Sequence, residues 1–236
     1  MTFYRSQLNC VAKIKSLSNY LVNKSRNVLS TLDKKIAFVT ANPYYETPYL
    51  KLGDPVCNDA ILTAQFYSQH GYKVYSLIDP DKETFVYYLK QFTEMELDDL
   101  IIYYAGHGGQ VKDTNGDEYD GKDETWIFYN GNLVDDELHS IWDNNKCRNI
   151  LVLSDSCHSG TIVETTRNNI ISFTGCKDHQ CSVQLNSNGM FTYYLFKFAT
   201  STTTLSELQQ KINNKIHNFN QCSQLSKYDS DRKLFL

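Results

Sequence analysis

The sequence lacks a long apolar segment and an excess of positive charge. No stretch approaches the roughly 18 consecutive apolar residues of a bilayer-spanning helix. The first twenty residues contain scattered charges and no apolar centre, which argues against a secretory leader. With 23 Lys and Arg against 27 Asp and Glu, the net charge of −4 gives no support to a nucleic acid or an anionic membrane as partner. We therefore expect a soluble intracellular protein, located in the cytoplasm.

The sequence also lacks regularly spaced cysteines. Its seven cysteines form an odd, irregular set. Without a leader, such a set predicts reduced thiols in an intracellular compartment. The segment Cys176-Lys-Asp-His-Gln-Cys181 has zinc-binding residue types, but no second ligand pair follows at a suitable spacing. We therefore do not expect a zinc site.

A chain of 236 residues suits one α/β domain or two small ones. Residues 1–33 are expected to form a weakly amphipathic helical lead-in. Apolar runs and turn residues predict strands over residues 35–40, 73–78, 99–104, 126–129, 149–154, 169–173 and 233–236. Helices are expected over residues 54–69, 81–92, 135–143, 189–199 and 205–218. This alternation predicts a mostly parallel sheet with helices on both faces, and the acidic residues 113–124 are expected to form a loop.

Two of the buried apolar runs end in polar turns that contain glycine. One turn is Gly106-His-Gly-Gly109 and the other is Asp155-Ser-Cys-His-Ser-Gly160. Ligands of α/β sheets bind beyond the carboxyl ends of the strands, so His107 and Cys157 are expected to meet there. A lone cysteine or histidine is usually structural, but the pair indicates a thiol nucleophile with an imidazole base. His158 is a poorer base, because adjacent side chains on an extended backbone point apart.

The glycines of these turns leave room for a peptide backbone to approach closely. Backbone N–H groups around Gly108 and Cys157 are natural donors to an oxyanion. The two turns therefore favour acyl-transfer chemistry.

Four motifs occur in order between residues 104 and 160. They are Tyr104-Ala-Gly-His-Gly-Gly-Gln110, Gly116-Asp-Glu-Tyr-Asp-Gly-Lys-Asp-Glu124, Val134-Asp-Asp-Glu-Leu138 and Asp155-Ser-Cys-His-Ser-Gly160. Together they resemble the type I metacaspases, which are caspase-like cysteine peptidases. The separation of 50 residues between His107 and Cys157 also agrees with caspase spacing. Weaker similarity extends from Lys35 to the C-terminus and includes Cys57-Asn-Asp-Ala60, residues 172–182 and Gly189-Met-Phe-Thr192.

The resemblance implies a caspase-hemoglobinase fold of the α/β class over residues 34–236. Its large-subunit-like part would be residues 34–160, and the linker 161–168 would precede a small-subunit-like part, residues 169–236. A monomer is expected.

The resemblance also implies cleavage of polypeptides after Arg or Lys rather than after Asp. Asp59 and Asp155 would bind the P1 side chain, with Gly108 and Ser156 as further substrate contacts. A carboxylate at position 155 independently favours a cationic P1 residue. Without the motif, Asp59 would be interpreted as a solvated carboxylate on a helix.

The resemblance further implies a calcium site. Asp113, Asn115, Asp117 and Glu124 imitate part of an EF-hand loop, but Glu118 stands where that loop needs glycine, so we reject an EF-hand. By similarity to metacaspases, the ligands of Ca²⁺ would be Asp123, Asp135, Asp136 and Glu164. The simpler alternative is a solvated acidic loop with Asp135 capping a helix. If calcium binds, we expect it to order the loops of the substrate cleft.

Two alternatives to an active metacaspase remain from the sequence. One is a catalytically silent caspase-like binding module, although His107 and Cys157 are both present. The other is a different peptidase of the same fold, of the separase or legumain kind. Arg167 is the one basic residue of the linker 161–168, which makes it the predicted position for self-cleavage.

Overall fold

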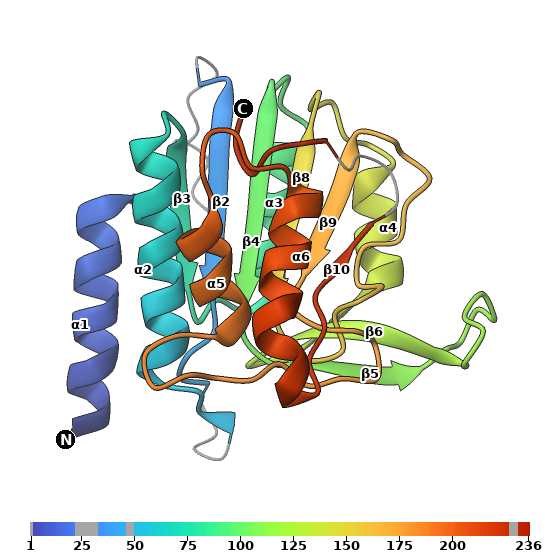
Figure 1. Ribbon diagram of the computed structural model, residues 1–236, viewed down its shortest axis with the longest axis horizontal. Coiled ribbons are helices and arrows are strands. Elements are labelled where there is room, and N and C mark those ends of the chain that lie inside the picture. Colours follow the sequence, from blue (N-terminus) through green and yellow to red (C-terminus); the bar gives the residue numbers. More distant parts are fainter. Residues whose placement is uncertain (1, 22–32, 46–49, 227–230) are drawn as a thin grey trace.

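A seven-stranded sheet forms the centre of the protein (Figure 1). The computed structural model describes residues 2–21, 33–45, 50–226 and 231–236. The strand order is β1-β3-β2-β4-β8-β9-β10, and every neighbouring pair is parallel except β9 with β10. The strands are β1 (Asn19–Tyr20), β2 (Lys35–Ala41), β3 (Lys73–Ile78), β4 (Asp99–Ala105), β8 (Ile150–Asp155), β9 (Ile170–Thr174) and β10 (Gln224–Leu225).

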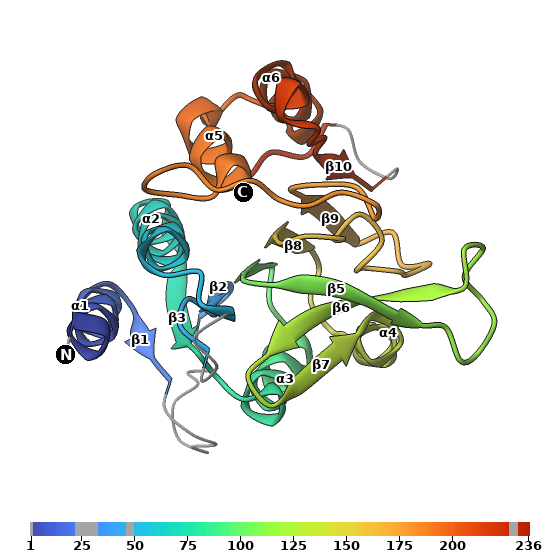
Figure 2. The same cartoon turned by 90° about the horizontal axis from the view of Figure 1, so that it is seen from below.

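Helices cover both faces of this sheet (Figure 2). One face carries α1 (Thr2–Leu17), α2 (Asp54–Gln69), α5 (Met190–Phe198) and α6 (Leu205–Ile216). The other face carries α3 (Lys82–Thr93) and α4 (Asp135–Trp142). The predicted mostly parallel sheet with helices on both faces is confirmed. Among the described residues, no helix combines the length and the apolar character that a bilayer span requires.

Strand β4 shows why the central strands are continuously apolar. Ile101 and Tyr103 pack in the core beneath α2, α5 and α6, whereas Leu100 and Ile102 pack in the core beneath α3 and α4. Successive side chains of a strand point to opposite faces, so a strand covered on both sides needs apolar residues at every position. This double burial fixes β4 in the centre of the molecule.

Local signals set the helix boundaries. Pro55 lies in the first turn of α2, and Gly71 follows the end of that helix with a φ of 82°. Asp81 caps α3 by accepting a hydrogen bond from the Thr84 backbone N–H. Thr204 and Glu207 form a reciprocal capping box at the start of α6.

A second, three-stranded antiparallel sheet lies across the carboxyl ends of the central strands (Figure 1). It consists of β5 (Gly108–Lys112), β6 (Lys122–Phe128) and β7 (Gly131–Val134). The loop predicted for residues 113–124 is wrong at its end, because β6 begins at Lys122. The strand predicted for residues 233–236 is also wrong. There, Lys233 forms one isolated bridge with Thr204.

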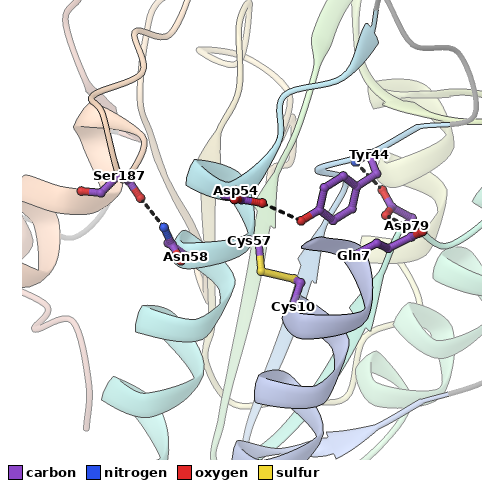
Figure 3. Close-up of a disulfide and its surroundings, with 8 residues drawn as sticks. All are labelled: Gln7, Cys10, Tyr44, Asp54, Cys57, Asn58, Asp79 and Ser187. Atoms are coloured by element: carbon purple, nitrogen blue, oxygen red, sulfur yellow. Dashed lines mark hydrogen bonds between the residues drawn. A yellow bond between two sulfur atoms is a disulfide. The ribbon is translucent and has the colours of Figure 1, made fainter. Parts of the chain in front are cut away.

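The N-terminal helix is covalently attached to the rest of the protein. A disulfide joins Cys10 of α1 to Cys57 of α2 (Figure 3). The prediction that all cysteines are reduced is therefore wrong for this pair; Cys147, Cys157, Cys176, Cys181 and Cys222 are free. The expected helical lead-in is present over Thr2–Leu17, and residues 22–32 of that segment lie outside the described residues.

Candidate active site

The pairing of two central strands brings the predicted nucleophile and base together. Ala105, the last residue of β4, is in register with Asp155, the last residue of β8. His107 and Cys157 each follow two residues later, so both emerge from the same level of the sheet. Both line one cavity of about 190 Å³ at the carboxyl ends of the strands. This is the position in which α/β sheets bind ligands.

The backbone of a preceding loop holds the His107 ring. Nε2 of His107 lies 2.7 Å from the carbonyl oxygen of Leu50. A carbonyl oxygen only accepts hydrogen bonds, so Nε2 carries the proton in the neutral ring and Nδ1 is left as the basic atom. Tyr45 supports the same residue, because its hydroxyl accepts a hydrogen bond from the His107 backbone N–H at 2.7 Å. No sequence pattern points to this orienting group, because any residue can supply a carbonyl.

Cys157 is half-buried in the cavity. Its sulfur accepts a hydrogen bond from the backbone N–H of Ser182 at 3.3 Å. Burial, followed by the neighbouring Cys181 thiol, raises the pKa of Cys157 to about 12. At neutral pH the resting side chain is therefore a thiol rather than a thiolate. A base must remove its proton during attack, and the imidazole in the same cavity is placed for that task.

Asp59 and Asp155 line the same cavity, and both are almost completely buried. Asp59 accepts hydrogen bonds from the Asn188 side chain and the Gly189 backbone N–H, both at 2.8 Å. Asp155 accepts from the Ser182 hydroxyl at 2.5 Å and from the Thr192 hydroxyl at 2.7 Å. The alternative of a solvated Asp59 on the helix surface is therefore wrong.

Gly189 lies against both carboxylates. A Cβ atom at this position would overlap a carboxylate oxygen of Asp155 and lie 3.0 Å from one of Asp59. Burial, followed by the charge of Asp155, raises the pKa of Asp59, and burial raises the pKa of Asp155. The described residues that line the cavity include no Lys or Arg. The pocket therefore has two carboxylates and lacks a cation of its own.

Gly108 and Ser156 do not line this cavity. A Cβ atom on Gly108 would overlap the Cys157 carbonyl oxygen, so this glycine allows β5 to approach the turn of the nucleophile. The Ser156 hydroxyl is buried and lies 2.9 Å from the hydroxyl of Ser154. The Ser156 hydroxyl therefore lies away from the cavity, whereas a substrate contact with the Gly108 backbone N–H stays a prediction.

His158 faces another part of the surface. Its Nδ1 contacts the carbonyl oxygen of Asp178, and the residue lines a different cavity beside β5 and β6. This placement agrees with the prediction that His158 is the poorer base.

The residues predicted to bind calcium lie in a dense acidic region between β5, β6 and α4. Its carboxylates form two compact trios whose oxygen atoms lie within 4.8 Å of one another. The trios are Asp113, Asp117 and Asp123, and Glu118, Glu124 and Asp135.

Two further predicted ligands adjoin these trios. Asp136 accepts hydrogen bonds from the Asn115 side chain at 2.9 Å. Glu164 lies beside Glu118 and affects the pKa of that carboxyl group. Burial, followed by the charge of Glu164, raises the pKa of Glu118 to about 8, and burial raises that of Asp135 to about 7.

These features place the chain in the class of α/β proteins whose thiol and imidazole meet at the carboxyl edge of a parallel sheet. The sequence profile described as "Caspase domain" matches residues 34–235. The chain therefore belongs to the caspase-domain family of peptidases.

Relatives and solved structures agree with this assignment. Metacaspase-1 of Schizosaccharomyces pombe is 49% identical over 71 residues, which are 27% of this chain and 16% of that protein. Metacaspase-1 of Saccharomyces cerevisiae is 40% identical over 75 residues, which are 28% of this chain and 17% of that protein. The matched segment thus spans less than a fifth of the length of these relatives.

Two solved structures share the fold. Caspase-1 from Spodoptera frugiperda superposes with a TM-score of 0.64 at 13% identity, covering 91% of this chain and 98% of the other. A protein from Geobacter sulfurreducens superposes with a TM-score of 0.70 at 23% identity, covering 86% and 98%. At these identities the likeness concerns the fold.

Proposed function

We propose that this chain is a cysteine endopeptidase. The observation that carries the proposal is the single cavity in which Cys157, His107 and two buried carboxylates converge. An intact thiol and imidazole favour catalysis over a silent binding module, because a binding module has no need of the pair. Family membership and the metacaspase relatives support polypeptides as the substrates.

The reaction uses His107 as the acceptor of the thiol proton. Nδ1 of His107 takes the proton while the sulfur of Cys157 attacks the scissile carbonyl carbon. The imidazolium then gives this proton to the leaving amine, and water releases the acyl group from sulfur. The Leu50 carbonyl accepts the Nε2–H throughout, which keeps the ring oriented and stabilises its charged form.

We propose that the P1 side chain is Arg or Lys. Asp59 and Asp155 share a buried pocket whose described lining includes no Lys or Arg. Burial raises the pKa of both carboxyl groups, and the charge of Asp155 raises that of Asp59 further. A guanidinium or ammonium group that enters the pocket removes the repulsion and pairs with the charges. An Asp side chain at P1 would add a third negative charge, so cleavage after Asp is disfavoured.

We propose that the acidic region binds Ca²⁺. Carboxylate oxygens suit this ion, and Glu118 Oε1 is a buried oxygen without a hydrogen-bond partner among the described residues. Asp123, Asp135, Asp136 and Glu164 are the proposed ligands. Asp123 belongs to one trio and Asp135 to the other, with Glu118 and Glu124 beside Asp135. The ion would supply positive charge between β5, β6 and the linker. Thr161 of the linker already contacts Glu124 and so connects this region to the Cys157 turn.

Removing a calcium ligand should remove thermal stabilisation by calcium. Asp136→Asn and Glu164→Gln are expected to weaken calcium binding at least about tenfold, because each removes a negative ligand. The measurement is the rise in unfolding temperature during a calcium titration, which needs no substrate. Asp120→Asn is the matched control, since Asp120 is an exposed acid in the same loop that is not one of the proposed ligands. An unchanged titration in both ligand variants would contradict the proposed site.

Self-cleavage is proposed at Arg167. The Arg167 side chain contacts the Asp143 carbonyl oxygen at the end of α4. This contact must break before the peptide bond after Arg167 can enter the active-site cavity. Incubation with calcium is expected to yield a fragment that ends at Arg167 and one that begins at Asn168. Arg167→Gln should stay intact, whereas Arg148→Gln, a change at an exposed arginine outside the linker, should still be cut. An intact wild-type chain that nevertheless hydrolyses peptides would exclude self-cleavage as a requirement.

We also propose that the protein is a monomer. Within the described residues, both edges of the central sheet are strands of two residues, β1 and β10, which offer little backbone for pairing with a second copy. The cytoplasmic location stays a prediction, and the Cys10–Cys57 disulfide argues against a strongly reducing compartment.

A further inference from the structure

A second cysteine lies directly beside the proposed nucleophile. The backbone N–H that donates to the Cys157 sulfur belongs to Ser182, whose preceding residue is Cys181. The Cys181 thiol also lies close enough to contribute to the raised pKa of Cys157. Because an amide nitrogen and the preceding Cα are separated by two bonds, the Cys181 side chain starts within a few ångströms of the Cys157 sulfur. The Cys181 side chain is thus a close neighbour of the Cys157 sulfur, beside the cavity that Cys157 lines.

The two thiols differ in their access to solvent. Among the free cysteines, Cys181 is the exposed one, whereas Cys157 is half-buried. Cys176 is also near but is buried, and its thiol donates to the carbonyl oxygens of Ser156 and Gln180 at 3.0 and 3.3 Å. Cys176 therefore has backbone partners that hold it in the interior. Cys181 is the thiol that a dissolved reagent meets first.

We propose that Cys157 and Cys181 form a reversible disulfide that blocks the nucleophile. The bond itself follows from the positions of the two thiols, and only its inhibitory effect rests on the proposed endopeptidase function. The oxidant is a low-molecular-weight disulfide, a class that includes oxidised glutathione. Cys181 is then a modification site through which the ratio of small disulfides to small thiols in solution determines whether Cys157 is free or blocked.

The reaction proceeds in two exchange steps. The thiolate of Cys181 attacks one sulfur of the small disulfide, which forms a mixed disulfide and releases one small thiolate. The Cys157 sulfur then attacks the Cys181 sulfur, and the second small thiolate leaves as the protein disulfide forms. The Cys157 proton passes to His107 and from there to the departing thiolate. Overall, two protein thiols are oxidised, and one small disulfide is reduced to two small thiols.

The measurement is the mass of the linked peptides. The full-length chain is incubated with oxidised glutathione, alkylated, and digested without reduction. A peptide pair joined through Cys157 and Cys181 is expected, with the loss of two hydrogen atoms and full reversal by dithiothreitol. In Cys181→Ser the Cys157 thiol should be lost at least about tenfold more slowly, because the exposed entry point is gone. Cys222→Ser, which removes a free cysteine that does not line the cavity, should behave like the wild type.

Each alternative outcome counts against the proposal. Glutathione that stays attached to Cys181 without a link to Cys157 would overturn it. A link between Cys157 and Cys176, or an equal loss of the Cys157 thiol in Cys181→Ser, would do the same. The mass readout is independent of catalysis. If the linked peptide forms in a chain that hydrolyses no substrate, the proposed function fails while the disulfide stands.

Discussion

Replacing Cys157 with alanine is expected to lower kcat/KM for a peptide with Arg at P1 by at least about a thousandfold. Alanine has no atom that can form the acyl intermediate, and without the thiol the His107 imidazole has no nucleophile to deprotonate. The assay is fluorogenic peptide hydrolysis in the presence of calcium. The substitution adds no bulk and leaves Ala105, Asp155 and their strand pairing in place.

The control is a second variant that has the same number of free thiols as Cys157→Ala. Cys222→Ala also removes one free thiol, but it lies outside the cavity and should retain activity. Unfolding temperatures of both variants should stay close to that of the wild type. If Cys157→Ala kept more than a small fraction of the activity while folded, Cys157 would not be the nucleophile, and a contaminating enzyme or another thiol would have to be sought.

Replacing Asp155 with asparagine is expected to reduce the preference for Arg over citrulline at P1 by about a hundredfold. Citrulline has nearly the shape of Arg but no charge, so this preference isolates the contribution of the ion pair. Asp155 is 7% exposed, and a cation beside it is poorly screened by water. The measurement is the ratio of kcat/KM values for two peptides that differ only at P1.

Asp155 also accepts hydrogen bonds from Ser182 and Thr192, so Asp155→Asn is expected to lower the stability of the fold as well. The ratio of the two kcat/KM values does not depend on the fraction of folded enzyme, so it reports the P1 preference alone. Asp79→Asn is the matched control. Asp79 is a carboxylate at the end of β3 that accepts a hydrogen bond from the Tyr44 backbone N–H and does not line the cavity. An unchanged preference in Asp155→Asn would remove that residue from the P1 pocket. A wild-type enzyme that prefers Asp at P1 would refute the role of both carboxylates.

Much of the central fold could be predicted from the sequence, because burial on both faces leaves a strong pattern. The run Leu100–Tyr104 is continuously apolar, and β4 spans Asp99–Ala105. The polar turns after β4 and β8 were equally visible, which is why His107 and Cys157 could be placed at one edge. Motif resemblance then added Asp59, whose helix pattern alone favoured solvent exposure.

Other features left no usable signal in the sequence. Strand β5 begins inside the glycine-rich turn, and the sequence pattern predicts no strand there. The Leu50 carbonyl and the Ser182 N–H are backbone groups, which every residue type possesses. The pairing of Cys10 with Cys57 depends on the packing of α1 against α2, and an odd number of cysteines pointed instead to reduced thiols.

The Cys10–Cys57 disulfide also imposes a practical conflict on any bench study of this protein. Its two cysteines are 47 positions apart, and a ring of that size restricts the unfolded chain by about 4 kcal/mol on the chain-entropy account. Thiol enzymes are normally handled in reductant, which would keep Cys157 reactive but threaten this ring. Both ring cysteines are buried, at 3% and 4% exposure, whereas Cys181 is accessible. A brief, mild reducing treatment should therefore restore the cavity and leave the covalent ring closed.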